Sequence, residues 1–236
     1  MCTVTFVKNK DRYILTSNRD EHTARPVALT PKVYAGGSKK LLYPKDTLSG
    51  GTWFVADDRS NMAVLLNGGE RFHRPTGDYR KSRGLILLDL ISQTDPFGYW
   101  NQMDLHRIEP FTVVLFQNLN LYQLRWNGED KNRVVLDITQ KHIWSSSTLY
   151  SQEMSLQRRK WFQSFLSGNG SPTPEELLDF HRNTKADNDE YGLMINRQNQ
   201  LKTLSITQGV VHKNRVELKY VQLEPDLVEQ HRYLVL

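Results

Sequence analysis

The chain has 236 residues, with 31 Lys or Arg against 26 Asp or Glu, for a formal net charge of +5. An apolar fraction of 38% and a charged fraction of 24% are those of a globular protein and exclude extensive disorder. The single cysteine, Cys2, excludes an internal disulfide framework and metal sites built from several cysteines. No apolar run reaches the roughly 20 residues of a membrane helix, and no secretory signal pattern opens the chain, so we expect a cytoplasmic protein without a membrane segment.

The first part of the chain predicts two hairpins separated by a loop. Alternating apolar residues indicate strands over residues 3–9 and 13–17, joined by a polar turn. A loop rich in Pro and Gly is expected over residues 26–51. A second hairpin follows, with strands over 52–56 and 62–66 and a polar turn between them.

Helical and extended segments alternate in the rest of the chain. The spacing of Leu and Ile predicts a helix from residue 78 to Pro96, with a short second helix over 97–106. Two further helices are expected over 151–166 and 174–181. The strands expected in this part are, in order, 111–116, 119–126, 133–138, 191–195, 201–211 and 216–223.

This order of elements predicts an α+β fold. Strands that follow one another through hairpins form antiparallel sheets, because parallel pairs need crossover helices. About ten strands and two helical regions favour a layered α+β sandwich. No long polar linker interrupts the chain, so we expect a single domain over residues 1–236.

The single cysteine is the first candidate for chemistry. Removal of the initiator methionine would leave Cys2 with a thiol and a free α-amine on one residue. An α-amine with a pKa of about 8 is partly neutral at pH 7 and can take the proton of a thiol, so nucleophile and base would belong to the same residue. The alternative is that a cysteine in this position has no chemical role.

The second candidate is the run Asn18-Arg19-Asp20-Glu21, which follows the first hairpin. Reversal of the chain in the hairpin brings this run back beside residues 2–4. An arginine there favours a thiolate, and an aspartate can orient an α-ammonium group or a substrate N–H. The alternative is an exposed strand end with salt bridges of little energetic weight.

A third candidate is formed by two turns rich in glycine. The run Gly50-Gly51-Thr52-Trp53 opens one strand of the second hairpin, and the other strand ends at Asn67. Paired glycines let the backbone approach a ligand closely, and the Asn67 amide can donate a hydrogen bond to an oxyanion. Ordinary turn chemistry is the alternative.

A basic run over residues 71–83 concentrates five cations against Asp78 alone. It is either a solvated loop or a groove for an anionic ligand. No recognised nucleic-acid module is present, so we expect no nucleic-acid partner. The seven histidines lack metal-ligand spacing and no phosphate-binding loop is present, so we expect no metal and no cofactor.

Six of these motifs together resemble the NRDE proteins, also called the transport and Golgi organisation protein 2 family. In chain order they are Met1-Cys2, Asn18-Arg19-Asp20-Glu21, Arg25-Pro26, Gly50-Gly51-Thr52-Trp53, the strand end at Asn67, and Ser82-Arg83-Gly84. The resemblance implies an N-terminal-nucleophile hydrolase fold, a four-layer αββα sandwich of two antiparallel sheets akin to penicillin acylase and bile-salt hydrolase.

The resemblance also implies roles for individual residues. Catalysis would fall to Cys2, Arg19, Asp20 and Asn67, with Cys2 as nucleophile and Asn67 in the oxyanion hole. Substrate binding would fall to Asn18, Glu21, Thr52, Trp53 and Arg83. The chain departs from the family pattern at Ser146, where the family has Asn, and near Leu204, where it has Arg.

Two functions follow from these residues and this resemblance. The first is a cysteine amidohydrolase that acts on the non-peptide C–N bond of a small or acyl amide. The second is a non-catalytic binding or trafficking protein for an anionic amphiphile such as an acyl-coenzyme A, a lipid or haem, since family members are linked to the homeostasis of such molecules. An interaction protein without a ligand is a third alternative.

Overall fold

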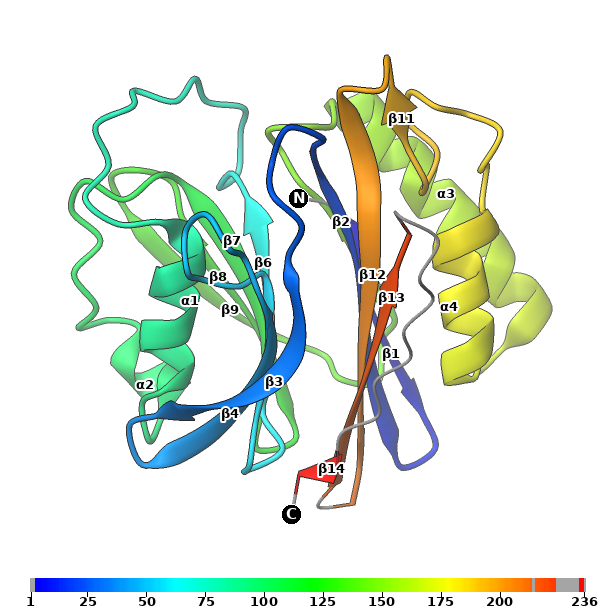
Figure 1. The fold of residues 1–236 in the computed structure, drawn as a ribbon. Coiled ribbons are helices and arrows are strands. Elements are labelled where there is room, and N and C mark those ends of the chain that lie inside the picture. Colours follow the sequence, from blue (N-terminus) through cyan, green and yellow to red (C-terminus); the bar gives the residue numbers. More distant parts are fainter. Residues whose placement is uncertain (1–2, 214, 224–233, 236) are drawn as a thin grey trace.

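The computed structural model describes residues 3–213, 215–223 and 234–235. Two antiparallel sheets pack face to face, and helices cover the outer face of each (Figure 1). On one side lie α1 (Arg83–Ile91) and α2 (Pro96–Tyr99), and on the other α3 (Gln152–Asn169) and α4 (Pro174–Asn183). The four layers confirm the predicted αββα sandwich. No helix in the described residues is both long and apolar enough to cross a membrane.

The first sheet contains the N-terminal strand in its interior. Its order is β10-β1-β2-β12-β13-β14, and β11 pairs with β12. The strands are β1 (Thr3–Asn9), β2 (Arg12–His22), β10 (His142–Ser145), β11 (Asn196–Arg197), β12 (Leu201–His212), β13 (Arg215–Gln222) and β14 (Leu234–Val235). Since β1 is flanked by β10 and β2, the start of this strand is held from both sides.

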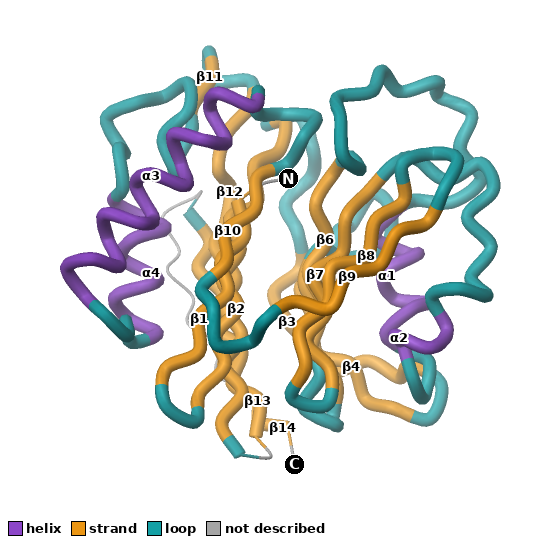
Figure 2. Tube along the Cα trace, turned by 180° about the vertical axis from the view of Figure 1, so that it is seen from behind, coloured by secondary structure: helices purple, strands orange, loops and turns teal. Residues whose placement is uncertain are grey.

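The second sheet is a meander in which each strand pairs with the next one in the chain. Its strands are β3 (Leu29–Gly36), β4 (Lys39–Lys45), β5 (Phe54–Asp57), β6 (Met62–Asn67), β7 (Phe111–Gln117), β8 (Asn120–Trp126) and β9 (Lys131–Leu136). The segment after β9 then crosses to the first sheet, where it forms β10 (Figure 2).

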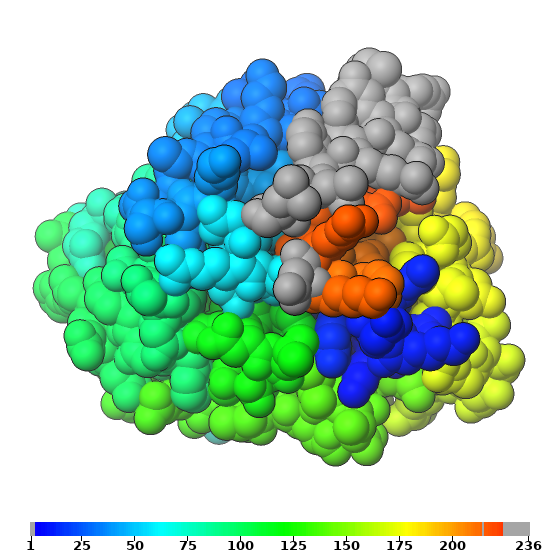
Figure 3. Space-filling view, turned by 90° about the horizontal axis from the view of Figure 1, so that it is seen from below, coloured from blue at the N-terminus to red at the C-terminus, as the bar shows by residue number. Residues whose placement is uncertain are grey.

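Apolar side chains fill three separate interfaces. Between the sheets, Phe6 and Leu15 from the first sheet pack with Trp53, Phe54 and others from the second. A second cluster lies under α1 and α2, and a third lies under α3 and α4. Each sheet and its helices form one half of the molecule. Seen from the end at which β1 turns into β2, the surfaces of the two halves adjoin (Figure 3). Burial of this apolar surface is the main favourable term that holds the layers together.

Helix boundaries follow local capping chemistry. The Ser82 side chain accepts a hydrogen bond from the Leu85 backbone N–H, so α1 begins at Arg83 and not at residue 78 as the apolar spacing had indicated. α4 begins with a capping box between Thr173 and Glu176, and Pro174 occupies its first turn, as expected.

Three further predictions about local structure were wrong, and one strand was not predicted. The predicted loop over 26–51 contains the β3–β4 hairpin, whose turn places Gly37 at φ +64°. The hairpin was missed because its two strands lack a clear alternation of apolar and polar residues. The predicted strand over 191–195 is a loop, because its backbone carbonyls accept hydrogen bonds from the side chains of Asn18 and Arg158 and not from a neighbouring strand. The short helix expected over 97–106 is the single turn of α2, and β10 was not foreseen.

Candidate active site

The end of β2 directs the Asn18-to-Glu21 run to both faces of the first sheet, because side chains alternate along a strand. Arg19 points toward the second sheet. Its Nη2 donates to Asp46 Oδ2 at 2.7 Å, and its guanidinium lies 4.3 Å from the centroid of the Trp53 ring. Asn18 and Asp20 make their contacts with residues on the helical side of the sheet. Asn18, Arg19 and Asp20 are therefore buried and Glu21 is half-buried, so the run is not an exposed strand end.

A cleft of about 410 Å³ opens between the sheets at the end where β2 and β6 finish, the upper end in Figure 1. We call it the first cleft. It is lined by six of the nine residues expected at the site, namely Arg19, Glu21, Thr52, Trp53, Asn67 and Arg83. Asn18 and Asp20 do not line it, and Cys2 lies outside the described residues.

The charges of the first cleft are arranged around Asp46. Burial opposes ionisation of its carboxyl, but hydrogen bonds from Arg25 and Ser49 outweigh burial and lower the pKa of Asp46 to about 2. Arg25 donates to both carboxylate oxygens at 2.7 and 2.9 Å, and Arg19 shares one of them. Asp46 therefore stays ionised and holds both guanidinium groups in fixed orientations.

Arg83 is the third arginine of the predicted motifs in this cleft, after Arg19 and Arg25. Its Nη2 lies 3.0 Å from Glu109 Oε2, and burial lowers the pKa of its guanidinium. Arg83 begins α1, so the helix start sets its position at the cleft wall.

Two glycines beside the first cleft, Gly51 and Gly84, allow two backbone segments to pack closely. A Cβ on Gly51 would lie 2.5 Å from the carbonyl carbon of Gly84, so both residues must be glycine for the first turn of α1 to meet the entry to β5. The Thr52 hydroxyl donates to the Pro44 carbonyl at 2.6 Å. Thr52 therefore shapes the cleft wall, and its hydroxyl proton is already used.

Trp53 is oriented from the opposite sheet. Its Nε1 donates to Thr207 Oγ1 of β12 at 3.3 Å, and its side chain is almost completely buried. The ring thus offers one face to the Arg19 guanidinium, a cation–π contact that fixes the arginine at the cleft floor.

Asn67 ends β6 and lines two clefts at once. The Ser146 hydroxyl donates to its backbone carbonyl at 2.8 Å. Its side-chain Oδ1 is buried without a hydrogen-bond partner among the described residues. Such an unsatisfied amide is unusual in a folded protein and is suited to a ligand.

The helical side of β2 contains a buried polar cluster that the sequence had not indicated. Asp20 accepts hydrogen bonds from Tyr150 Oη at 2.5 Å and from Thr203 Oγ1 at 2.6 Å. Beside it, Arg158 of α3 donates to Thr3 Oγ1 at 2.5 Å. Thr3 is the residue that follows the predicted nucleophile, Cys2, in the chain.

A larger cleft of about 770 Å³ lies on the other side of Asn67. We call it the second cleft. The loop after β6, the strand β10 and the first turns of α3 form its walls. Its charged residues are Glu70, Arg71, Arg125 and Arg159, and in the described part of the chain none of the three arginines makes an ion pair.

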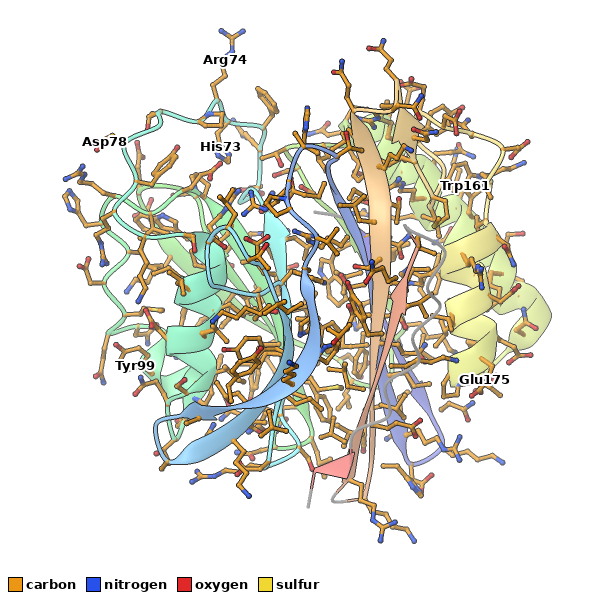
Figure 4. All side chains as sticks on the ribbon, viewed as in Figure 1. His73, Arg74, Asp78, Tyr99, Trp161 and Glu175 are labelled. Carbon is orange, nitrogen blue, oxygen red and sulfur yellow. The ribbon has the colours of Figure 1, made fainter. Side chains whose placement is uncertain are left out.

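The cations of the basic run over residues 71–83 do not lie together in the structure. Arg80 pairs with Asp104 and Lys81 with Asp89. Arg74 points away from the molecule on the loop that follows β6 (Figure 4). The run is thus mostly a loop with surface ion pairs, and it contributes Arg71 to the second cleft and Lys81 and Arg83 to the first.

A family model described as Transport and Golgi organisation 2 matches residues 1–220. The chain belongs to this family. The match confirms the resemblance that the six motifs indicated, and it extends over strands and helices well beyond them. No curated protein sequence matches the chain significantly.

Solved structures similar to this Transport and Golgi organisation 2 protein are hydrolases of the N-terminal-nucleophile fold. A Caenorhabditis elegans N-acylethanolamine-hydrolyzing acid amidase ortholog superposes with a TM-score of 0.61 at 11% identity, covering 88% of this chain and 92% of that one. A variant of the conjugated bile acid hydrolase from Clostridium perfringens gives a TM-score of 0.49 at 11% identity, covering 99% and 97%. At such identity the likeness concerns the fold alone.

Both departures from the family pattern lie at the candidate site. Ser146, where the resemblance implied an Asn, contacts the Asn67 carbonyl and Thr148 Oγ1. Leu204 lies at a register shift between β2 and β12, where Thr203 pairs with Asp20 and Ser205 with Arg19. Ser146 and Leu204 therefore do not supply the amide and the guanidinium that the resemblance implied at these two positions.

Asn18 belongs to the framework behind the site. Its Nδ2 donates to the carbonyls of His181 and Leu193, and its Oδ1 lies 2.5 Å from His181 Nδ1. His181 Nε2 lies 2.7 Å from Thr5 Oγ1. All polar atoms of the Asn18 side chain are therefore used to join β2 to α4, and Asn18 is a positioning residue.

Acidification is expected to destabilise the protein through His181. Burial, together with the charge of Arg158, lowers the pKa of His181 to about 3, whereas in an unfolded chain it lies near 6.5. Between these values the unfolded state binds more protons, so stability is lost as the pH falls below about 6.5. Urea unfolding at pH 7 and pH 5 should differ by about 2 kcal/mol, and His181→Gln should remove most of this difference. An equal difference in both proteins would contradict the assignment.

Proposed function

We propose that this protein is a cysteine amidohydrolase of the N-terminal-nucleophile type that cleaves the non-peptide C–N bond of a small or acyl amide. The observation that carries the proposal is the convergence of three elements. β10 joins the start of β1 to Asn67, because Thr3 pairs with Ser145 and the Ser146 hydroxyl bonds with the Asn67 carbonyl. The end of β2 brings Arg19 to the cleft that Asn67 lines, and Asp20 lies beside it in the chain on the helical face of the same sheet.

In the proposed reaction Met1 is removed and the α-amine of Cys2 takes the thiol proton. The thiolate attacks the amide carbonyl carbon, and a C–S bond forms. The resulting ammonium then protonates the leaving nitrogen as the C–N bond breaks, which yields a thioester and a free amine. A water molecule, deprotonated by the α-amine, hydrolyses the thioester and returns the thiol.

The described residues have distinct parts in this scheme. The Asn67 side chain makes no hydrogen bond to the described residues, so its Nδ2 group is available to donate to an oxyanion. Arg19 Nε is buried without an acceptor in the described part of the chain and can favour the thiolate. Asp20 would bind the α-ammonium group, with Tyr150 and Thr203 holding its carboxylate in place.

The test of this proposal is turnover of a panel of N-acyl amides with short, medium and long acyl chains. Release of the free amine is measured for the wild-type protein and for Cys2→Ala. Turnover that requires Cys2 would support the proposal, and the absence of turnover across a broad panel would count against it.

The second cleft favours a second candidate function, the binding of an anionic amphiphile. Arg71, Arg125 and Arg159 exceed the single acid Glu70 by two charges. Arg125 Nε is buried without a hydrogen-bond partner among the described residues. Two large apolar side chains also line this cleft while exposed to solvent, Phe72 at 66% and Leu156 at 52%. Unpaired cations beside exposed apolar groups suit a ligand with an anionic and an apolar part.

Arg125→Gln is expected to weaken the binding of a fluorescent fatty acid by about 10-fold or more, because it removes a charge-assisted hydrogen bond. The measurement is a fluorescence titration with the fatty acid and with the matching fatty alcohol, whose binding should change little. Arg133→Gln is the matched control, since Arg133 stacks on Phe97 outside the cleft. Equal affinities of wild type and Arg125→Gln for the fatty acid would remove Arg125 from the binding site.

A further inference from the structure

The rim of the second cleft combines apolar and cationic side chains from two different elements. In the loop after β6, Phe72 follows Arg71, and its side chain is 66% exposed. In α3, Leu156 and Arg159 lie three residues apart on one side of the helix, and Leu156 is 52% exposed. Two elements far apart in the chain thus bring the same pair of chemical groups to one opening.

The exposed position of Phe72 is fixed by contacts on both sides of it in the chain. The Ser147 hydroxyl donates to the Arg71 carbonyl at 3.4 Å, and His73 Nε2 lies 3.1 Å from Glu109 Oε1. Turning Phe72 inward would break these contacts. An apolar side chain that is held in water in this way costs free energy, which a partner that covers it would recover.

The arginines of this rim are free to meet an anionic partner. Arg71, Arg74 and Arg159 make no ion pair within the described residues, and Arg74 points away from the molecule (Figure 4). Over residues 70–74 and 152–160 together, four exposed cations stand against two exposed acids. The rim therefore has an excess of positive charge beside its exposed apolar groups.

A lipid bilayer with anionic headgroups matches this rim better than an acidic protein does. A bilayer offers anionic groups directly above apolar chains, so Phe72 and Leu156 can enter between the headgroups while neighbouring arginines contact the anions. The rim also surrounds an open cleft of about 770 Å³ with Arg125 in its lining. A protein partner would need an acidic protrusion that fills this cleft, whereas an amphiphile can enter it from the bilayer.

We propose that the rim of the second cleft is a membrane-docking surface for anionic lipid bilayers. Arg71, Arg74 and Arg159 contact the headgroups, and Phe72 and Leu156 insert among them. In this position the protein takes an amphiphile from the bilayer into the second cleft without passage of the amphiphile through water. Docking goes beyond the proposed amide reaction, because it needs neither the Cys2 thiol nor the first cleft.

The test is co-sedimentation of the full-length protein with vesicles of phosphatidylcholine, either alone or with about 30% phosphatidylserine. The wild-type protein should bind the anionic vesicles about 10-fold more tightly than the neutral ones at about 0.1 M NaCl. Raising the salt to about 0.5 M should remove most of this preference, because salt screens the charges of the arginines.

Phe72→Ser and Leu156→Ser should each weaken binding to the anionic vesicles about 5- to 10-fold, because an apolar group no longer enters the headgroup layer. Leu119→Ser is the matched control and should bind as the wild type does. Leu119 is 58% exposed and lies beside Asp11, in the turn between β1 and β2 at the other end of the sandwich. Arg74→Gln should weaken binding to the anionic vesicles about 5-fold and leave binding to the neutral ones unchanged.

Equal binding of the wild type to neutral and anionic vesicles would overturn the proposal, and so would Phe72→Ser that binds as tightly as Leu119→Ser. A water-soluble short-chain phosphatidylserine that binds while vesicles do not would identify a site for a free ligand. Polyglutamate that binds as tightly as the vesicles would identify an acidic protein as the partner, and either result would also overturn the proposal. Since vesicle binding requires no turnover, its failure is distinguishable from failure of amide hydrolysis.

Discussion

Cys2→Ala is expected to lower the turnover of any amide substrate by at least about 10⁴-fold, because the substitution removes the thiol that forms the acyl-enzyme in the proposed reaction. The Asn67 amide and the two clefts remain, so substrate binding should persist in this variant. The measurement is steady-state release of amine under conditions in which wild-type turnover is readily detected. Cys2→Ala that keeps most of the activity would rule out the thiol as nucleophile.

Cys2→Ser is the matched control for this experiment. It retains an α-amine after Met1 removal and places a hydroxyl where the thiol was, so a small residual activity is expected. Both variants should unfold at the wild-type urea concentration. A large loss of stability in either would mean that the loss of activity reports on the fold and not on the nucleophile.

Lys39→Met is expected to destabilise the protein by about 3–5 kcal/mol, because it leaves a buried carboxylate without its cation. Lys39 Nζ lies 2.8 Å from Asp57 Oδ2, and both side chains are fully buried. Nζ also donates to the Ile91 carbonyl at 3.0 Å, so the pair ties β4 and β5 to the end of α1. Urea unfolding at pH 7 measures the loss.

The control for Lys39→Met is the same substitution at the next residue. Lys40 is exposed, and Lys40→Met should change the free energy of unfolding by no more than about 0.5 kcal/mol. Equal stabilities of the Lys39→Met and Lys40→Met proteins would show that the buried pair does not stabilise the second sheet.

The alternation of apolar residues was sufficient to predict the layers that surround the site. The strands beginning at Thr3 and ending at Asn67 were predicted from that alternation. Asn67 lines both clefts, and Thr3 pairs with Ser145 of the second cleft. The alternation of a strand also explains why Arg19 and Asp20, although adjacent, contact different sides of the first sheet. Since this alternation can be read from the sequence, it was possible to predict that Arg19 and Asp20 lie on different faces of the sheet.

The helical side of the site could not be predicted as completely. Arg158 precedes Phe162 by four residues, so helical spacing placed it on the apolar face of α3, but nothing local indicates that Thr3 accepts its hydrogen bond. Tyr150 and Thr203 meet Asp20 across 130 and 183 residues of chain. Such contacts are set by the packing of whole layers and have no signature in a short window of sequence.

The most direct test of the proposed cysteine amidohydrolase is the intact mass of the purified protein before and after incubation with an N-acyl amide that is turned over. We expect a mass lower by one methionine residue before incubation. After rapid acid quenching we expect an added acyl group, mapped to Cys2 as a thioester. A fully active protein that retains Met1, or turnover that never yields an acyl adduct on Cys2, would rule out the proposed reaction.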